Sequence, residues 1–156
     1  MRTKKFTWED ISKLINKIAN EVKNDFNPDV IIAIQRGGFI PAVYLSHLLN
    51  VRDIRPLNII RTKDDKVMSE KIIPIIKNKM VLNGIRGKNV LIVDDIVGSG
   101  ESLKIVQKII LSKKPKEIKK AIILINEINL NKTKDKPIVN YIGKRIKAWA
   151  IFPWEK

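Results

Sequence analysis

Apolar residues along this chain gather into short runs without alternation, and helix-like stretches separate the runs. Such runs are typical of strands that a parallel sheet buries on both faces. Strands are expected at Val30–Ile34, Ile54–Ile60, Asn89–Val93 and Ala121–Ile125, and helices at Phe39–Leu49 and Glu101–Ser112. Strands joined through helices imply right-handed crossovers. The pattern therefore predicts an α/β fold with a mainly parallel sheet.

An amphipathic helix is predicted before the first strand. Thr7 can cap it and Asp10, three residues later, can complete a capping box. One face carries its apolar residues at helical spacing, namely Trp8, Ile11, Leu14, Ile15, Ile18 and Val22. Asn27-Pro28 ends the pattern. We expect this face, including Trp8, to pack into the core.

The pattern loosens between residues 61 and 87. Residues 61–66 are mostly charged, whereas Ile72–Ile76 is apolar and contains a proline. Two short antiparallel strands with a loop between them would fit this composition. A plain surface hairpin is the alternative to a functional role, and Ser69 is a candidate for one.

Two adjacent carboxylates, Asp94 and Asp95, directly follow the apolar run that starts at Val90. Ligands of open α/β sheets bind at the carboxyl ends of the strands, which is where these two acids lie. Ordinary turn residues or helix caps would also explain them. Paired acids at this place favour a ligand that carries a diol.

A glycine-rich turn, Val97–Ser102, follows the acids and leads into the predicted helix at Glu101. Gly98 and Gly100 let backbone N–H groups converge on an anion. Ser99 and Ser102 add hydroxyl donors. The helix directs its positive end to the same point. No Gly-Lys-Ser/Thr follows, and no third glycine completes a dinucleotide fingerprint. Acids and turn together indicate a site for a phosphorylated ribose.

A second turn, Gln35-Arg36-Gly37-Gly38, follows the first predicted strand. Its two glycines permit a close backbone approach to an anion, and the helix from Phe39 directs its positive end there. The Arg36 guanidinium is a fork of donors suited to phosphate oxygens. A basic residue in a tight turn is the structural alternative. The turn indicates a second anion site beside the first.

Three segments together resemble the type I phosphoribosyltransferases. Val90–Leu103 resembles the family's ribose-phosphate signature, and Ile31–Leu45 is similar to its pyrophosphate loop and the helix after it. Trp149–Glu155 resembles the tail of small bacterial and archaeal purine enzymes, especially the xanthine–guanine type. The resemblance covers most of the chain. It implies Mg²⁺-dependent transfer of ribose 5-phosphate from phosphoribosyl pyrophosphate to a purine, with hypoxanthine, guanine or xanthine favoured.

The resemblance also implies roles for residues. Asp94 and Asp95 would be catalytic, hold the ribose hydroxyls and contact a Mg²⁺ ion that the substrate mainly binds. Substrate contacts are expected from Gln35, Arg36, Gly37, Gly38, Ile96, Val97, Gly98, Ser99, Gly100, Glu101, Ser102, Glu127, Trp149 and Ala150. One domain, 1–156, would contain a lid at about 61–87 and a base-binding hood at about 126–156. A homodimer is expected.

Two positions depart from the 6-oxopurine enzymes. Gly98 stands where the family carries a loop acid near the base, and Glu101 is a candidate replacement. Asn126 or Glu127 stands in place of a lysine that reads the 6-oxo group. A carboxylate there can accept a hydrogen bond from an exocyclic amine. Adenine therefore stays open as the alternative base.

Composition adds few constraints. The net charge of +15 allows nucleic-acid binding, so a regulator that keeps the sugar-phosphate site is an alternative, as is a catalytically idle binding module. We expect most of the charge to be solvated lysine and nucleic acid not to be a partner. Cysteine is absent and the one histidine, His47, is expected to be structural. No targeting or membrane segment is apparent, which favours the cytoplasm.

Overall fold

The computed structural model describes residues 2–61 and 74–155, and its centre is a five-stranded sheet. The strands lie in the order β3-β2-β6-β7-β8, and every neighbouring pair is parallel. Their bounds are β2 Val30–Ile34, β3 Ile54–Leu57, β6 Asn89–Val97, β7 Glu117–Asn126 and β8 Tyr141–Ile146. The predicted α/β class with a mainly parallel sheet is confirmed.

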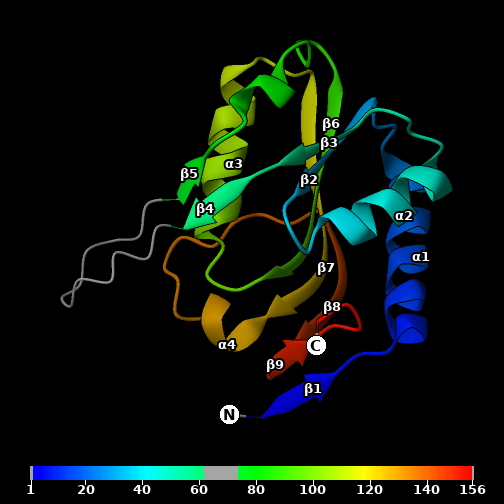
Figure 1. The fold of residues 1–156 in the computed structure, drawn as a ribbon, viewed down its shortest axis with the longest axis vertical. Helices are drawn as coiled ribbons and strands as arrows, with labels where there is room; N and C mark the ends of the chain where they lie inside the picture. The colour runs from blue at the N-terminus through cyan, green and yellow to red at the C-terminus, as the bar shows by residue number, and fades with distance from the viewer. Residues whose placement is uncertain (1, 62–73, 156) are drawn as a thin grey trace.

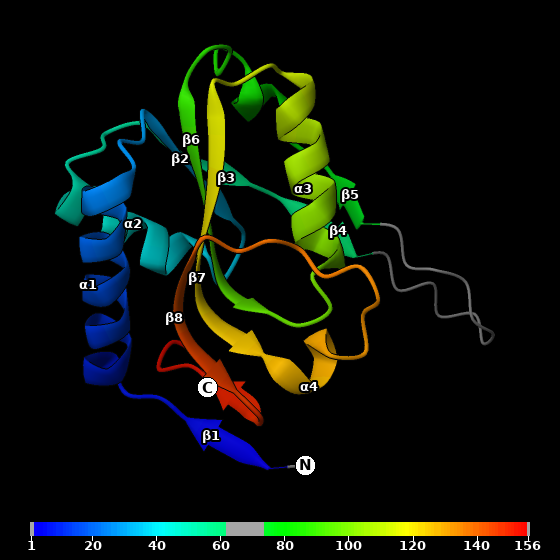
Figure 2. The same cartoon turned by 180° about the vertical axis from the view of Figure 1, so that it is seen from behind.

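Helices cover both faces of this sheet (Figures 1 and 2). Helices α1 (Trp8–Asp25) and α2 (Phe39–Leu49) cover one face, and α3 (Glu101–Ser112) covers the other. Alternate residues of β2 pack against opposite faces of the sheet. Ile31 belongs to the hydrophobic cluster that α1 and α2 form with the sheet, and Ile32 to the cluster that α3 forms with it. Because both faces are covered, all five residues of β2 are buried, as the unbroken apolar run predicts.

The first helix begins as its sequence predicts. The Thr7 hydroxyl accepts from the Asp10 backbone N–H, and the Asp10 carboxylate accepts from the Thr7 backbone N–H in return. Ile11, Ile15, Ile18, Ala19 and Val22 are its buried residues. The expectation for Trp8 is wrong, because its side chain is 58% exposed. It is the first residue of the helix, and its ring lies against the Trp154 ring, with centroids 5.8 Å apart.

The predicted strand at Ile54–Ile60 is two strands, β3 and β4 (Ile59–Arg61). The Asn78 side chain causes the interruption: its Oδ1 accepts from the Asn58 backbone N–H at 2.8 Å and its Nδ2 donates to the Pro56 carbonyl. After this break β4 pairs antiparallel with β5 (Pro74–Ile76), so the expected hairpin is confirmed at its base. Residues 62–73, with Ser69, lie outside the described residues.

Strands β6 and β7 run further than their apolar runs predict. β6 continues through Asp94 and Asp95 to Val97, and β7 begins at Glu117, ahead of two lysines. The Lys119 ammonium pairs with Asp25 of α1, which lets a charged residue sit in the strand. Polar partners on neighbouring elements thus extend strands beyond the hydrophobic pattern.

The two ends of the chain form a small second sheet. β1 (Thr3–Lys5) pairs in parallel with β9 (Trp149–Ile151). Phe152 stacks on Trp154 with ring centroids 4.6 Å apart and also contacts Phe6. Short helices α4 (Glu127–Leu130) and η1 (Lys79–Leu82) complete the elements. The sequence pattern did not predict β1, β8, β9, α4 or η1.

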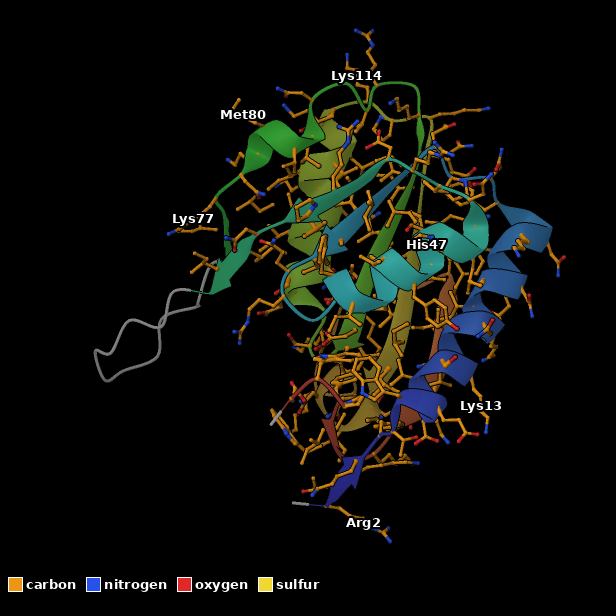
Figure 3. All side chains as sticks on the ribbon, turned by 45° about the vertical axis from the view of Figure 1, so that its right-hand side comes forward. Arg2, Lys13, His47, Lys77, Met80 and Lys114 are labelled. Carbon is orange, nitrogen blue, oxygen red and sulfur yellow. The ribbon has the colours of Figure 1, made fainter. Side chains whose placement is uncertain are left out.

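Basic side chains project from all over the surface. Lys13, Lys77 and Lys114 point outward from three separate parts of the molecule, and His47 lies on the exposed side of α2 (Figure 3). Within the described ranges, no helix is both long and apolar enough to cross a membrane.

Candidate active site

The topology of the sheet brings three chain segments together at one edge. β2 and β7 are the neighbours of β6, with Ala33 beside Val93 and Asp94 beside Ile122. Because all three strands are parallel, the segments that follow them leave the sheet on the same side. The turn after β2, the acids and turn of β6, and α4 after β7 consequently surround one place.

Asp94 and Asp95 are held by the backbone at this edge. Asp94 Oδ1 accepts from the Asp95 N–H at 2.9 Å, and Asp95 Oδ1 accepts from the Ile96 N–H at 2.7 Å. Burial raises the pKa of the Asp95 carboxyl above its usual range, and the negative charge of Glu155 raises it further. A cation that forms next to Asp95 would relieve this unfavourable environment.

The turn after β2 lies directly against Asp95. A Cβ atom on Gly37 would overlap the Asp95 carboxylate, and one on Gly38 would lie 2.6 Å from the Ile34 carbonyl oxygen. Both glycines are therefore needed for close packing. The Gln35–Arg36 peptide bond is cis, and the exposed Arg36 side chain stands at the edge of the site.

The turn after β6 is supported from its other side. Gly100 has a φ of +80°, and a Cβ there would overlap the Pro137 ring. The Thr133 hydroxyl donates to the Ser99 carbonyl at 3.1 Å. Gly98 differs, because a Cβ at this position would meet only Asn129 atoms at 3.6 and 3.7 Å. The connection after α4 thus fixes the turn and leaves room beside Gly98.

The two longer helices that start at this edge begin differently from the other α-helices. α1 is capped by the Thr7 side chain and α4 by that of Asn126. α2 and α3 begin after Gly38 and Gly100, which have no side chain to form a capping bond, and at α3 the Glu101 N–H donates to Ser99 Oγ at 3.5 Å. Their first N–H groups carry the positive ends of two helix dipoles. Two helix N-termini of this kind suit a ligand with two anionic groups.

A cavity of about 620 Å³, the Trp149 cavity, opens beside the β6 turn. It is lined by Ile96, Gly98, Ser99, Asn126, Asn129, Lys132, Thr133, Trp149, Ala150 and Glu155. The Trp149 side chain is 55% exposed and contacts no other aromatic ring of the described residues. Its indole can therefore stack on a flat ligand, with amide, ammonium and carboxylate groups around it.

A second cavity, the Arg36 cavity, has a volume of about 490 Å³ and includes Asp95 in its lining. Its lining residues are Arg36, Gly37, Ile40, Asp95, Trp154 and Glu155. Glu155 lines both cavities, and its Oε2 is fixed by the Phe152 backbone N–H at 2.9 Å. The two cavities thus meet at Glu155, close to Asp95.

The structure brings most of the predicted site residues to this edge. Ile96, Gly98, Ser99, Trp149 and Ala150 line the Trp149 cavity, while Arg36, Gly37 and Asp95 line the Arg36 cavity. Asp94, in β6, lines neither cavity. The same is true of the turn residues Gln35, Gly38, Val97, Gly100, Glu101 and Ser102. Glu127 begins α4 and lines neither.

Sequence reasoning missed several lining residues, above all Asn129, Lys132 and Thr133. All three follow β7, whose run of apolar residues was recognised. Since β7 neighbours β6, the rule that places ligands at strand carboxyl ends could have indicated them. The order of the strands was the missing information.

The donor set fits a Mg²⁺ ion only in part. Asp94 and Asp95 supply hard carboxylate oxygens, which Mg²⁺ prefers. The described residues contain no group of three or more His, Cys, Asp or Glu that could enclose a metal ion. This arrangement suits an ion that takes most of its ligands from a bound substrate and water.

Comparison with known proteins agrees with this geometry. Residues 6–155 match the model of the phosphoribosyl transferase domain. The xanthine-guanine phosphoribosyltransferase of Gluconobacter oxydans is 26% identical over 96% of this chain and 82% of its own length. The hypoxanthine-guanine enzyme of Aquifex aeolicus is 29% identical over 74% of this chain and 66% of its own. The crystal structure of a purine phosphoribosyltransferase from Pyrococcus horikoshii has a TM-score of 0.82 and 29% identity, covering 100% of this chain and 95% of that one.

Proposed function

Since the chain belongs to the phosphoribosyltransferase family, we propose that it transfers the ribose 5-phosphate group of phosphoribosyl pyrophosphate to a purine base and releases pyrophosphate. One observation carries this proposal beyond the family match. Two helix N-termini that begin after glycine residues, at Gly38 and Gly100, flank the adjacent carboxylates Asp94 and Asp95. The substrate has the matching pattern, with an anionic group on each side of a diol.

In this assignment the β6 turn binds the 5-phosphate through backbone N–H groups, Ser99 and Ser102. Arg36 and the N-terminus of α2 bind the pyrophosphate. The bond from the ribose carbon to the pyrophosphate oxygen breaks and a bond to a purine nitrogen forms, while the proton of that nitrogen is released to solvent. Positive charge that develops on the ribose ring is stabilised by Asp94 and Asp95.

Magnesium belongs to the proposal as well. Asp94 and Asp95 would contact the ion, which supplies neutralisation of the leaving pyrophosphate when it is bound. The chain's own residues position the substrate. Gly37 packs against Asp95 and so fixes the distance between the pyrophosphate turn and the ribose acids.

The Trp149 cavity is the proposed base site. Trp149 stacks the purine, and the exposed Lys132 ammonium and the Asn129 amide offer hydrogen-bond donors. Donors match the acceptors O6 and N7 of a 6-oxopurine, whereas the amine of adenine gains nothing from an ammonium group. This favours hypoxanthine, guanine or xanthine, in keeping with the names of the relatives above.

The first test is release of pyrophosphate from phosphoribosyl pyrophosphate with Mg²⁺, offering adenine, hypoxanthine, guanine, xanthine, uracil and orotate in turn. Release with one or more 6-oxopurines is expected. If no pyrophosphate is released with any base although phosphoribosyl pyrophosphate binds, the proposed activity is overturned and a binding protein is favoured. Release with adenine alone would overturn only the base assignment.

Variants assign the chemistry to residues. Asp94→Asn combined with Asp95→Asn is expected to abolish turnover while far-UV circular dichroism stays unchanged. Glu9→Gln is the matched control, because it removes a carboxylate from the exposed face of α1. Normal turnover in the double variant would contradict the role of both acids.

A second pair of variants tests the base site. Lys132→Met should raise the KM for guanine, while Lys134→Met, two residues along and also exposed, should not. Equal KM values in the two variants would remove Lys132 from the base site.

We also propose a homodimer in the cytoplasm. Four large side chains on α1 and α2 are more than a third exposed, namely Trp8, Phe39, Val43 and Tyr44, and they would suit a subunit contact. Light scattering after gel filtration tests this, since a monomeric mass at assay concentration would contradict the dimer.

A further inference from the structure

A third cavity, of about 370 Å³, shares no lining residue with the two cavities of the proposed reaction site and is lined by a buried lysine. We call it the Lys120 cavity. It lies beside α3 and the connection 131–140, which passes the N-terminal end of that helix (Figure 2). The polar residues among its lining are Lys104, Gln107, Lys120, Asp135, Lys136 and Asn140. Nothing in the proposed transfer reaction uses these residues.

Lys120 is the unusual member, because only 3% of the residue is exposed. Buried lysines normally pair with a carboxylate. Lys120 Nζ instead donates to the neutral Gln107 Oε1 at 2.6 Å, and no ion pair with a carboxylate forms within the described ranges. Burial accordingly lowers the pKa of this ammonium. Gln107 satisfies one of the three ammonium protons.

The rest of the lining keeps the cavity positive. Lys104 and Lys136 bring two more ammonium groups, and Asp135 is the single carboxylate. Asp135 pairs with Lys104 at 3.0 Å, but its side chain is 92% exposed, so that it compensates little of the charge. A positive, partly enclosed cavity with a desolvated ammonium has the properties of an anion site.

We propose that the Lys120 cavity binds a phosphate group as a second anion site, separate from the one at the β6 turn. The phosphate would accept hydrogen bonds from the Lys120 ammonium, the Asn140 amide and the lysines at the rim. Its source is either free inorganic phosphate or the terminal phosphate of a nucleotide. Pro137 lines this cavity and also packs against Gly100, so the site adjoins the β6 turn without sharing its N–H groups.

Isothermal titration calorimetry of the full chain tests the proposal, first with inorganic phosphate and then with adenosine triphosphate. Lys120→Met should lose one binding site or weaken it by about tenfold or more, since it removes a charged hydrogen-bond donor. Lys108→Met is the matched control and should bind as the wild type does, because Lys108 is an exposed lysine of α3 that does not line the cavity. If inorganic phosphate binds more tightly than adenosine triphosphate, the source is free phosphate. The reverse order identifies the terminal phosphate of a nucleotide.

Asp135→Asn provides a second, opposite test. It removes the only carboxylate of the lining from an exposed position, so the fold is not at risk. Phosphate binding at this site should become about twofold to fivefold tighter. Identical sites and affinities in wild type, Lys120→Met and Asp135→Asn would overturn the proposal. A site at the β6 turn survives Lys120→Met, so this result is independent of the proposed transferase activity.

Discussion

Replacing Gly37 with alanine tests whether the turn after β2 and the acids of β6 form one catalytic unit. The added Cβ atom would overlap the Asp95 carboxylate. The backbone itself tolerates the change, because Gly37 is not among the glycines with positive φ. The side chain of Asp95 must therefore rotate, and the expected damage falls on the site more than on the fold.

The magnitude follows from the contact that is lost. Asp95 Oδ1 accepts from the Ile96 N–H at 2.7 Å, and rotation breaks this bond. A hydrogen bond to a charged group contributes about 1.5–3 kcal/mol. If that orientation is needed in the transition state, kcat/KM falls by about 10- to 150-fold. Crowding in the interior would lower the free energy of unfolding by about 1–3 kcal/mol.

The assay is pyrophosphate release with guanine, with kcat/KM measured for phosphoribosyl pyrophosphate, together with thermal unfolding. Gly84→Ala is the control, because Gly84 is exposed outside both cavities and a Cβ there has nothing within 4 Å. It should retain kcat/KM, although its φ of +73° makes some loss of stability expected. Wild-type kcat/KM in Gly37→Ala, or an equal loss in both variants, would refute the contact between Gly37 and Asp95.

Three other perturbations have expected outcomes. Gly100→Ala should lower the melting temperature and raise the KM for phosphoribosyl pyrophosphate, because it strains a residue at φ +80° and meets Pro137; unchanged values of both would contradict this. Thr7→Ala should cost about 1 kcal/mol of unfolding free energy in urea titrations, since it removes the α1 cap. The Arg55 guanidinium holds the pKa of Asp53 below its usual range, so this pair stabilises the fold fully above pH ~4 and less as pH falls through the lowered pKa. Asp53→Asn should therefore reduce the melting temperature at pH 7 and make little difference near pH 2, and an equal deficit at both pH values would refute the linkage.

Local patterns of the sequence were sufficient for elements that depend on nearby residues. The bounds of β2, α2 and α3 agree with those predicted, and the Thr7–Asp10 capping box forms as expected. Unbroken apolar runs and capping residues act over a few positions, so one chain segment carries the whole signal.

Elements that depend on distant partners were not predicted. β1 and β9 are three residues each and exist because they pair with one another from opposite ends of the chain. Strand β7 includes Lys119 and Lys120 because Asp25 and Gln107 provide partners for their ammonium groups. Such partners lie more than ten residues away, where no local pattern can reveal them.

The candidate site also has parts that depend on nearby residues and parts that depend on distant ones. The sequence by itself determined the α/β class, the two glycine-rich turns and the acids Asp94 and Asp95, because each is a short motif at the end of an apolar run. Only the tertiary structure decided that Asn129 and Lys132 line the same cavity as Trp149, and that Glu155 lines two cavities. The order of parallel strands sets which loops become neighbours, and this order depends on packing across the whole sheet.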